Sequence, residues 1–245
     1  SPVLDVSSAL SGRAWQWRGG NMEIEPNSDP TRLNHDITSQ LLMTRGVDED
    51  DLTRHANPTL REFLPTPSDF RDMDRAAERI AEAVLSREKI TVYGDYDVDG
   101  ATSAALLVET LRSLGHDADY YIPDRLLEGY GPSGEALVKL GERLDECDVG
   151  AAHGHVAAVG VAFLLAVALV RTLRKRRFFE DRPEPKLMEL LDLVALGTVA
   201  DVAALHGLNR AFVAQGLKVL AQRKRTGMAA LIDASRLKRS PIASD

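Results

Sequence analysis

Cysteine and aromatic residues are both scarce in this chain. One cysteine in 245 residues leaves no partner for a disulfide, so a disulfide framework is excluded and a reducing cytoplasm is the natural setting. Aromatic residues make up 5% of the sequence, which argues against extensive base stacking within it. The longest apolar run, residues 156–170, is shorter than the roughly 18 residues of a membrane span. We therefore expect a buried helix there and no membrane partner.

An excess of positive charge is lacking as well. The formal net charge is −7, so bulk electrostatics does not indicate a protein that coats DNA. A nuclease is not excluded, because carboxylates that bind divalent cations count as negative and a basic channel can be local. Residues 1–5 show no basic and apolar pattern typical of a signal peptide. We expect a cytoplasmic location.

The chain divides by composition into three stretches, and its length suits one large domain or two small ones. Residues 1–55 are polar without a sustained period and are predicted to form a loosely packed N-terminal arm. Pro58 and the Pro65-Thr66-Pro67 segment mark a boundary. Residues 56–207 are predicted to form the main domain, and residues 208–245 a C-terminal helix and connector.

Regular structure is predicted from the hydrophobic spacing of the main domain. A helix at 73–87, a β-branched strand at 90–93, a loop at 95–100, a helix at 101–114 and a strand at 119–122 together predict a βαβ unit with a parallel sheet. Further helices are predicted at about 131–142, 157–175, 187–195 and 208–222. Residues 144–155 have no strand character. The prediction is an α/β fold with helices on both faces of a parallel sheet that lacks one or two strands.

An acidic segment follows the first predicted strand. In Gly94-Asp95-Tyr96-Asp97-Val98-Asp99-Gly100, three carboxylates alternate and point the same way if the backbone is extended. Their mutual repulsion is relieved by a hard divalent cation such as Mg²⁺ or Mn²⁺. Loops at the carboxyl ends of parallel strands are also where such sheets bind ligands. The segment therefore predicts a metal site.

Three other interpretations of the acidic segment remain open. A calcium loop needs glutamate at its twelfth position, which is Leu106 when counted from Asp95, and a helix rather than a strand before it. A solvated acidic turn explains neither the alternation nor the hydrophobic strand. A response-regulator-like acidic pocket shares the carboxylates at a strand end.

Several stretches, in order along the chain, resemble the conserved segments of one family. Residues 92–100 resemble the first motif of RecJ-type single-stranded-DNA exonucleases, which belong to the DHH phosphoesterase superfamily. Residues 121–131, 159–163 and 197–202 resemble later motifs, and Asn209-Arg210 follows them. Residues 7–12 and 60–73 resemble the amino-terminal part of the family. The resemblance thus covers nearly the whole chain.

The resemblance implies a set of metal ligands. Asp97 and Asp99 would bind metal with Asp95 beside them, and Asp201 would supply a ligand from the far side of the site. Asp97, Asp99 and Asp201 are accordingly the predicted catalytic residues, with two Mn²⁺ or Mg²⁺ ions as cofactors. In such a site one cation activates water and both stabilise the attacking and leaving oxygens.

The resemblance also implies 5′-to-3′ degradation of single-stranded DNA in DNA repair and recombination, with repair proteins as possible partners. Arg125 and Tyr130 would lie near the nucleic acid, although a surface salt bridge and a packed turn explain them equally well. Sequence-independent strand binding needs a basic groove. Its candidates are Arg174, Arg176 and Arg177, with further basic residues at 171, 175, 223–225 and 236–239; a solvated helix end is an equal alternative for each cluster.

One part of the family pattern is absent from this sequence. No Asp-His-His triplet occurs, and neither does the strand ending in a metal-binding aspartate that should precede it. Both belong between residues 142 and 159, with a junction near Arg143-Leu144. Either residues are omitted from the sequence or the deletion is real. His153 and His155 are expected to serve a local loop or helix start rather than to replace these ligands.

Two alternative functions follow from these departures. A DHH-type phosphoesterase could act on short oligonucleotides or cyclic dinucleotides instead of long strands. A real deletion would instead leave a catalytically inactive binding module. The C-terminal nucleic-acid-binding domains usual in the family are also absent, so we expect residues 208–245 to lead toward them.

Overall fold

The computed structural model of the chain describes residues 30–128, 155–236 and 241–242. The chain divides into two compact units, residues 1–57 and residues 58–245. The predicted helix at 131–142, the junction at 143–144, Tyr130 and His153 lie outside the described residues. All the site residues discussed below belong to the second unit.

The described part of the first unit is helical, which the prediction of a polar N-terminal arm at 1–55 did not include. Its elements are α1 (Pro30–Met43), the 3₁₀ helix η2 (Glu49–Asp51) and α2 (Leu52–Ala56). Leu33, Ile37 and Leu41 recur at helical spacing in α1. The residues between them are all polar, and this polar background hides the pattern.

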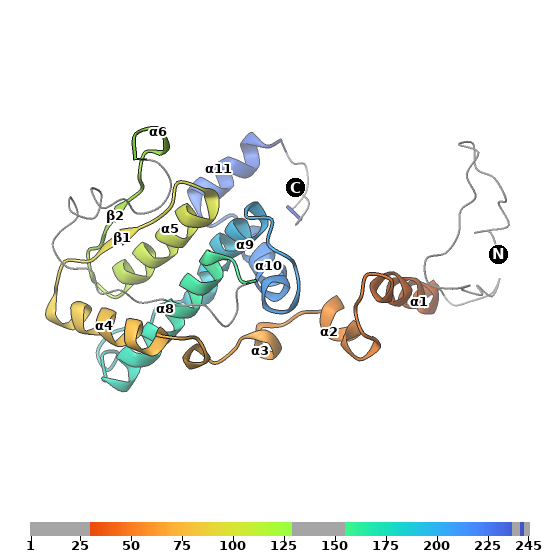
Figure 1. Cartoon of the computed structure of the whole chain (residues 1–245), viewed down its shortest axis with the longest axis horizontal. Coiled ribbons are helices and arrows are strands. Elements are labelled where there is room, and N and C mark those ends of the chain that lie inside the picture. Colours follow the sequence, from red (N-terminus) through yellow and green to blue (C-terminus); the bar gives the residue numbers. More distant parts are fainter. Residues whose placement is uncertain (1–29, 129–154, 237–240, 243–245) are drawn as a thin grey trace. The chain divides into compact units, whose positions relative to one another are not determined.

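The second unit contains the predicted parallel βαβ arrangement. β1 (Thr91–Tyr93) leads through α5 (Val98–Ser113) to β2 (Asp119–Tyr121). The two strands pair in parallel with Thr91 opposite Asp119 and Tyr93 opposite Tyr121. Within the described residues the sheet has only these two strands (Figure 1). The structure thus agrees with a parallel sheet that is short of strands.

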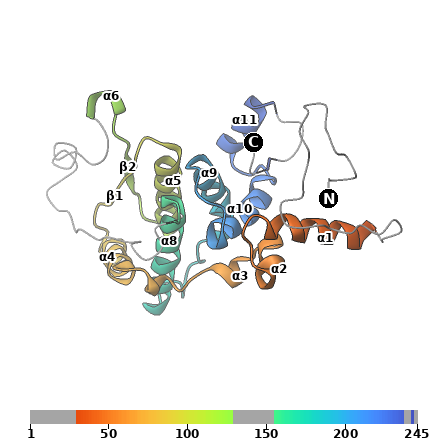
Figure 2. The ribbon, with the colours of Figure 1, turned by 45° about the vertical axis from the view of Figure 1, so that its right-hand side comes forward.

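Most of the described second unit is helical. The long helices are α4 (Met73–Ser86), α8 (Ala158–Lys175), α9 (Leu191–Ala200) and α10 (Gly207–Leu220). α8 packs against α4 and α5, while α9 packs against α5 and α10 (Figures 1 and 2). The shorter elements are α3 (Leu60–Phe63), η3 (Pro67–Asp69), α6 (Arg125–Glu128), η5 (Leu187–Leu190) and α11 (Thr226–Ala234). No described helix is both long and apolar enough to cross a bilayer.

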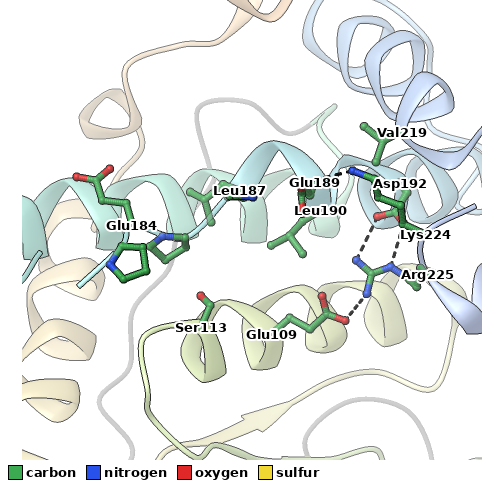
Figure 3. Close-up of a pocket in the computed structure, with 13 residues that line it drawn as sticks. Glu109, Ser113, Glu184, Leu187, Glu189, Leu190, Asp192, Val219, Lys224 and Arg225 are labelled. Carbon is green, nitrogen blue, oxygen red and sulfur yellow. Dashed lines mark hydrogen bonds and ion pairs between the residues drawn. The ribbon is translucent and has the colours of Figure 1, made fainter. Parts of the chain in front are cut away.

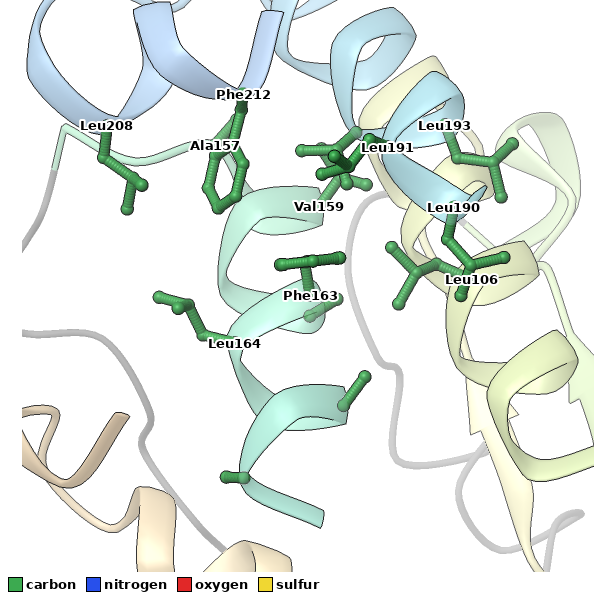
Figure 4. Packing of buried hydrophobic residues seen from close by; sticks show 14 of the residues in the cluster. Leu106, Ala157, Val159, Phe163, Leu164, Leu190, Leu191, Leu193, Leu208 and Phe212 are labelled. Carbon is green, nitrogen blue, oxygen red and sulfur yellow. The ribbon is translucent and has the colours of Figure 1, made fainter. Parts of the chain in front are cut away.

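The main hydrophobic core lies where α8 meets α9 and α10. Phe163 of α8 and Phe212 of α10 are 1% and 0% exposed, and their ring centroids are 5.4 Å apart in an edge-to-face arrangement (Figure 4). Leu191 and Val194 of α9 belong to the same cluster. A smaller cluster joins Val92 of β1 to α4, α5 and α8. Truncating a phenylalanine buried in this way costs about 3–5 kcal/mol, so this helical core carries much of the stability.

Candidate functional site

The turn between β1 and α5 brings the acidic segment close to the sheet. A Cβ atom on Gly100 would come within 2.6 Å of the backbone nitrogen and oxygen of Asp95. A Cβ on Gly94 would lie 2.8 Å from Ile122 Cδ1 and 2.9 Å from Ala104 Cβ. Both positions therefore need glycine so that the chain can turn sharply from the strand into the helix.

The backbone of the acidic segment is extended at Asp97 but helical from Val98 onward, which corrects the expectation that its three carboxylates alternate along a loop. α5 begins at Val98, so Asp99 lies in its first turn and Asp97 is its N-cap. Asp97 Oδ1 accepts a hydrogen bond of 2.6 Å from the Gly100 N–H. Capping the free N–H groups of a helix start stabilises it, and this gain decides the local conformation.

Asp99 is the most enclosed of the predicted ligands, with 7% exposure. Its two carboxylate oxygens accept hydrogen bonds of 2.8 Å from Ala158 N–H and 2.9 Å from Val159 N–H. These donors belong to the N-terminus of α8, where the helix dipole favours a negative charge. Asp99 thus joins the starts of two helices that are distant in sequence.

Burial raises the pKa of the Asp99 carboxyl above its ordinary value. The two backbone hydrogen bonds from Val159 and Ala158 lower this pKa, and the negative charges of Asp201 and Asp97 raise it again. A charge acts on a pKa in this way only from nearby. The structure therefore brings Asp97, Asp99 and Asp201 into one electrostatic neighbourhood.

Asp201 reaches that neighbourhood from the end of α9. It is the C-cap residue of α9 and is exposed. A Cβ on Gly197, one turn earlier, would collide with the Thr102 hydroxyl and come within 3.1 Å of Asp99 Oδ1. The absence of a side chain at Gly197 therefore allows α9 to lie directly on the first turn of α5.

The described aspartates do not by themselves form a metal-binding cluster. Within residues 30–128, 155–236 and 241–242, no three His, Cys, Asp or Glu side chains converge closely enough to hold an ion. Asp95 Oδ1 already accepts a hydrogen bond of 2.7 Å from Tyr96 N–H, and Asp97 and Asp99 are engaged as described. These side chains alone do not fit a divalent ion, so a metal site here needs additional ligands.

The predicted nucleic-acid-binding residues occupy two places. The Arg125 guanidinium lies 5.1 Å from the centre of the Tyr96 ring, next to the acidic segment. At the C-terminal end of α8, Arg174 pairs with Glu184, Arg176 with Glu78 and Arg177 with Glu180. Arg174 lies sixteen residues beyond Ala158, which is about 24 Å along the helix. Tyr130 lies outside the described residues.

His155 is exposed, and its backbone carbonyl accepts a hydrogen bond of 2.7 Å from Asn209 Nδ2. This contact supports the prediction of a local role at the start of α8. Asn209 is fully buried, and the sequence resemblance noted it without assigning it any role.

An ion cluster that the sequence did not predict lies at the other end of α5. Arg225 pairs with Asp192 of α9 through a 2.9 Å contact from its Nε, and with Glu109 of α5 through its Nη1 (Figure 3). The cluster lines a cavity of about 460 Å³ that also includes Ser113 and Lys224. Glu109 lies ten residues after Asp99, or about 15 Å along α5, so this cavity is separate from the acidic site.

Comparison with known protein families identifies the domain to which the acidic segment belongs. The DHH family, N-terminal domain, matches residues 89–152, which include β1, the acidic segment, α5 and β2. The acidic segment is therefore part of a DHH domain.

Proteins similar to this chain over most of its length point to one type within the DHH family. The single-stranded-DNA-specific exonuclease RecJ of Bacillus subtilis is 33% identical over 81% of this chain and 30% of its own length. The RecJ of Escherichia coli is 34% identical over 91% of this chain and 47% of its own length. The chain is thus similar to RecJ proteins over most of its length, and its residues 89–152 match the DHH family. It spans less than half of the length of these relatives.

Solved structures agree with this assignment. The structure of an exonuclease RecJ bound to manganese matches 69% of this chain and 53% of its own, with a TM-score of 0.58 and 30% identity. The Thermus thermophilus RecJ complex with Mn²⁺ matches 80% of this chain and 33% of its own, with a TM-score of 0.60 and 29% identity. The described elements therefore have the α/β fold of DHH-type proteins.

The alignments also show that this chain is shorter than its relatives within the matched region. The B. subtilis alignment spans 247 positions but includes 81% of the 245 residues, or about 198, so about 49 positions face a gap in this chain. The E. coli alignment spans 277 positions and includes 91%, or about 223 residues, which leaves about 54. Both values agree with the absence of the Asp-His-His segment from the sequence.

Proposed function

We propose that this chain carries out metal-dependent hydrolysis of phosphodiester bonds in single-stranded DNA, as the catalytic part of a RecJ-type 5′-to-3′ exonuclease. The observation that supports the proposal is that α9 packs on the first turn of α5, so that Asp201 lies near Asp97 and Asp99 at the end of the β1–α5 unit, although the three carboxylates need further ligands to hold an ion. The names of the relatives support single-stranded DNA as the substrate. The manganese and magnesium complexes of the neighbouring structures support these ions as cofactors.

The proposed roles of individual residues follow from their positions. Asp97 and Asp201 would contribute ligands, with Asp95 beside them, and Asp99 would do so only by giving up its contacts with α8. Arg125, held over Tyr96, would contact a DNA phosphate close to the acidic site. Arg174, Arg176 and Arg177 would contact a longer strand farther away, in competition with their present carboxylate partners. Tyr130 is proposed to lie near the nucleic acid on resemblance alone.

A second function is an inactive form that binds single-stranded DNA without cleaving it. Two observations favour it: about 50 aligned positions of the relatives face a gap in this chain, and the described aspartates do not form a cluster of three ligands. An incomplete ligand set cannot fix the geometry that two-metal hydrolysis requires.

Cleavage assays separate these functions. The purified chain is incubated with Mn²⁺ and a single-stranded oligonucleotide labelled at its 5′ or 3′ end, with Asp97→Asn as the control. Early release of 5′-labelled mononucleotides that is lost in Asp97→Asn supports the exonuclease. Strand binding without cleavage supports the inactive form. Hydrolysis of a cyclic dinucleotide in preference to the long strand would replace both with a small-substrate phosphoesterase.

The cellular setting is part of the same proposal. An enzyme of this type would work in the cytoplasm beside proteins of DNA repair and recombination. Co-purification of such proteins with the tagged chain, lost after nuclease treatment, would indicate an association through DNA.

A further inference from the structure

One buried amide lies between the two segments that support the acidic site. Asn209, in the first turn of α10, is 0% exposed. Its Nδ2 donates hydrogen bonds of 2.7 Å to the His155 carbonyl and 3.1 Å to the Ala204 carbonyl. A carboxamide nitrogen has two protons to donate, so a single side chain satisfies both acceptors.

Each of these carbonyls belongs to a segment that carries an acidic residue or its hydrogen-bond donors. His155 lies three residues before Ala158, whose N–H, with that of the next residue, holds the Asp99 carboxylate. Ala204 lies in the turn that follows Asp201 at the end of α9. Asn209 therefore links the donors that hold Asp99 to the turn that places Asp201.

The same face of α10 also makes apolar contact with the start of α8. Phe212 lies one turn after Asn209, and a Cβ on Gly160 would approach its Cε2 to 3.2 Å. Figure 4 shows the Phe212 ring beside Ala157 and near Val159. Apolar packing is not directional, so it fixes how closely the helices approach. The directional hydrogen bonds of Asn209 join α10 to the residues just before α8 and just after α9.

The turn after Asp201 is strained without such support. Val202 has a φ of 57°, in the left-handed region that β-branched residues rarely adopt, and its side chain is 88% exposed. No packing of that side chain holds the conformation. Backbone hydrogen bonds from Val202 N–H to the Val199 carbonyl and from Ala203 N–H to the Thr198 carbonyl hold it instead. The Asn209 amide adds a bond to the Ala204 carbonyl, which also accepts one from His206 N–H.

We propose that Asn209 is a positioning residue of the acidic site, which sets the relative position of Asp99 and Asp201 by hydrogen-bonding to the backbone next to each. Only the consequence for metal binding and activity rests on the function proposed above. The structural linkage does not.

The test compares two side-chain amides on α10. Asn209→Ala removes the link, whereas Gln215→Ala removes a comparable 2.9 Å hydrogen bond from the same helix to the Pro58 carbonyl. In ¹H–¹⁵N spectra of the full chain, Asn209→Ala should shift the amide signals of Ala158 and Val159 together with those of residues 202–204. Gln215→Ala should leave both groups unchanged. If Asn209→Ala moves the signals of 202–204 but leaves Ala158 and Val159 where they are, the proposal is wrong.

Two further measurements test the role of Asn209 independently of the amide shifts in the variant. If Asn209→Ala does not fold, exchange of the Asn209 side-chain protons in the wild-type chain decides: slow exchange supports the double hydrogen bond, and rapid exchange contradicts it. Mn²⁺ titration followed by electron paramagnetic resonance should show roughly tenfold weaker binding in Asn209→Ala, as for the loss of other groups that orient metal ligands. A wild-type chain that binds no Mn²⁺ would count against the proposed function, while the amide signals would still decide the role of Asn209.

Discussion

The carboxylates at the two ends of α5 have different kinds of partner. At its C-terminal end, Glu109 and the buried Asp192 share the guanidinium of Arg225 (Figure 3). At its N-terminal end, Asp97 and Asp99 lie near Asp201, and in the part of the chain that the structure describes their hydrogen-bond donors are backbone N–H groups. α9 lies along α5 and contributes to both ends.

This difference indicates that one end of the α5–α9 pair contributes mainly to stability and the other mainly to function. A buried carboxylate neutralised by arginine is satisfied within the chain, and removing one partner is costly. Carboxylates gathered without a neutralising side chain keep a negative potential that attracts a cation, and such groups are typical of functional sites. We therefore expect substitutions at the Arg225 end to change the free energy of unfolding, and those at the Asp97 end to change ligand binding.

The largest effect on stability should come from Arg225→Met. The variant leaves Asp192, whose side chain is 6% exposed, without its cation. Because the Arg225 and Glu109 side chains keep some contact with solvent, we expect a loss near the lower end of the range for broken buried pairs, about 3 kcal/mol. Urea denaturation at neutral pH measures this loss.

Arg223→Met is the matched control, since Arg223 pairs with Asp233 on an exposed surface. Its loss should stay below about 1 kcal/mol. Equal losses in the two variants would mean that the Arg225 cluster is no more structural than a surface ion pair.

Asp99→Asn should change the pH dependence of stability. Burial, Asp201 and Asp97 raise the pKa of Asp99 despite its backbone hydrogen bonds, so the folded chain holds this proton more tightly than the unfolded chain. The contribution of Asp99 to stability is therefore greatest below its ordinary pKa of 3.8 and falls as pH rises through the raised value. The slope can reach about 1.4 kcal/mol per pH unit.

Urea denaturation of both proteins across this pH range gives the difference in unfolding free energy, wild type minus Asp99→Asn. We expect this difference to decrease as pH rises. An increase would mean that the hydrogen bonds from α8 outweigh burial and like charge.

The smallest effect should come from Val202→Gly. Removing the Cβ relieves the left-handed conformation at φ 57°, and the gain should be about 1 kcal/mol after the entropy cost of glycine. Val202→Ala keeps a Cβ and should gain less. Thermal unfolding of the three proteins measures this order, and a glycine variant less stable than the wild type would show that the turn is not strained.

The sequence predicted those elements whose determinants are local. α4, β1 and β2 were expected within a few residues of their observed bounds. The apolar residues of α4 recur at helical spacing, and the short strand segments are rich in β-branched and aromatic residues. α11 was missed, and the helix predicted at 187–195 ended too early, since α9 continues to Ala200. Gly197 remains helical because α9 packs directly on α5 there.

The residue types of the acidic segment predict a metal site, which stays a prediction, but they did not predict the contacts of these residues. Alternating aspartates indicated a site, yet the cap formed by Asp97 turned the extended loop into a helix. The hydrogen bonds from Ala158 and Val159 to Asp99 join residues about 60 positions apart in the sequence. Arg225 likewise pairs with Glu109 and Asp192, which are distant from it in the sequence. Such contacts depend on how helices pack, which hydrophobic periodicity does not encode.

The cation site proposed at the Asp97 end of α5 includes Asp201 and needs further ligands besides the three aspartates. Equilibrium binding of Mn²⁺ to the wild-type chain and to Asp201→Asn tests it most directly. We expect saturable binding by the wild type that weakens by roughly tenfold or more in the variant. Equal affinity in the two proteins, or no binding to either, would contradict it.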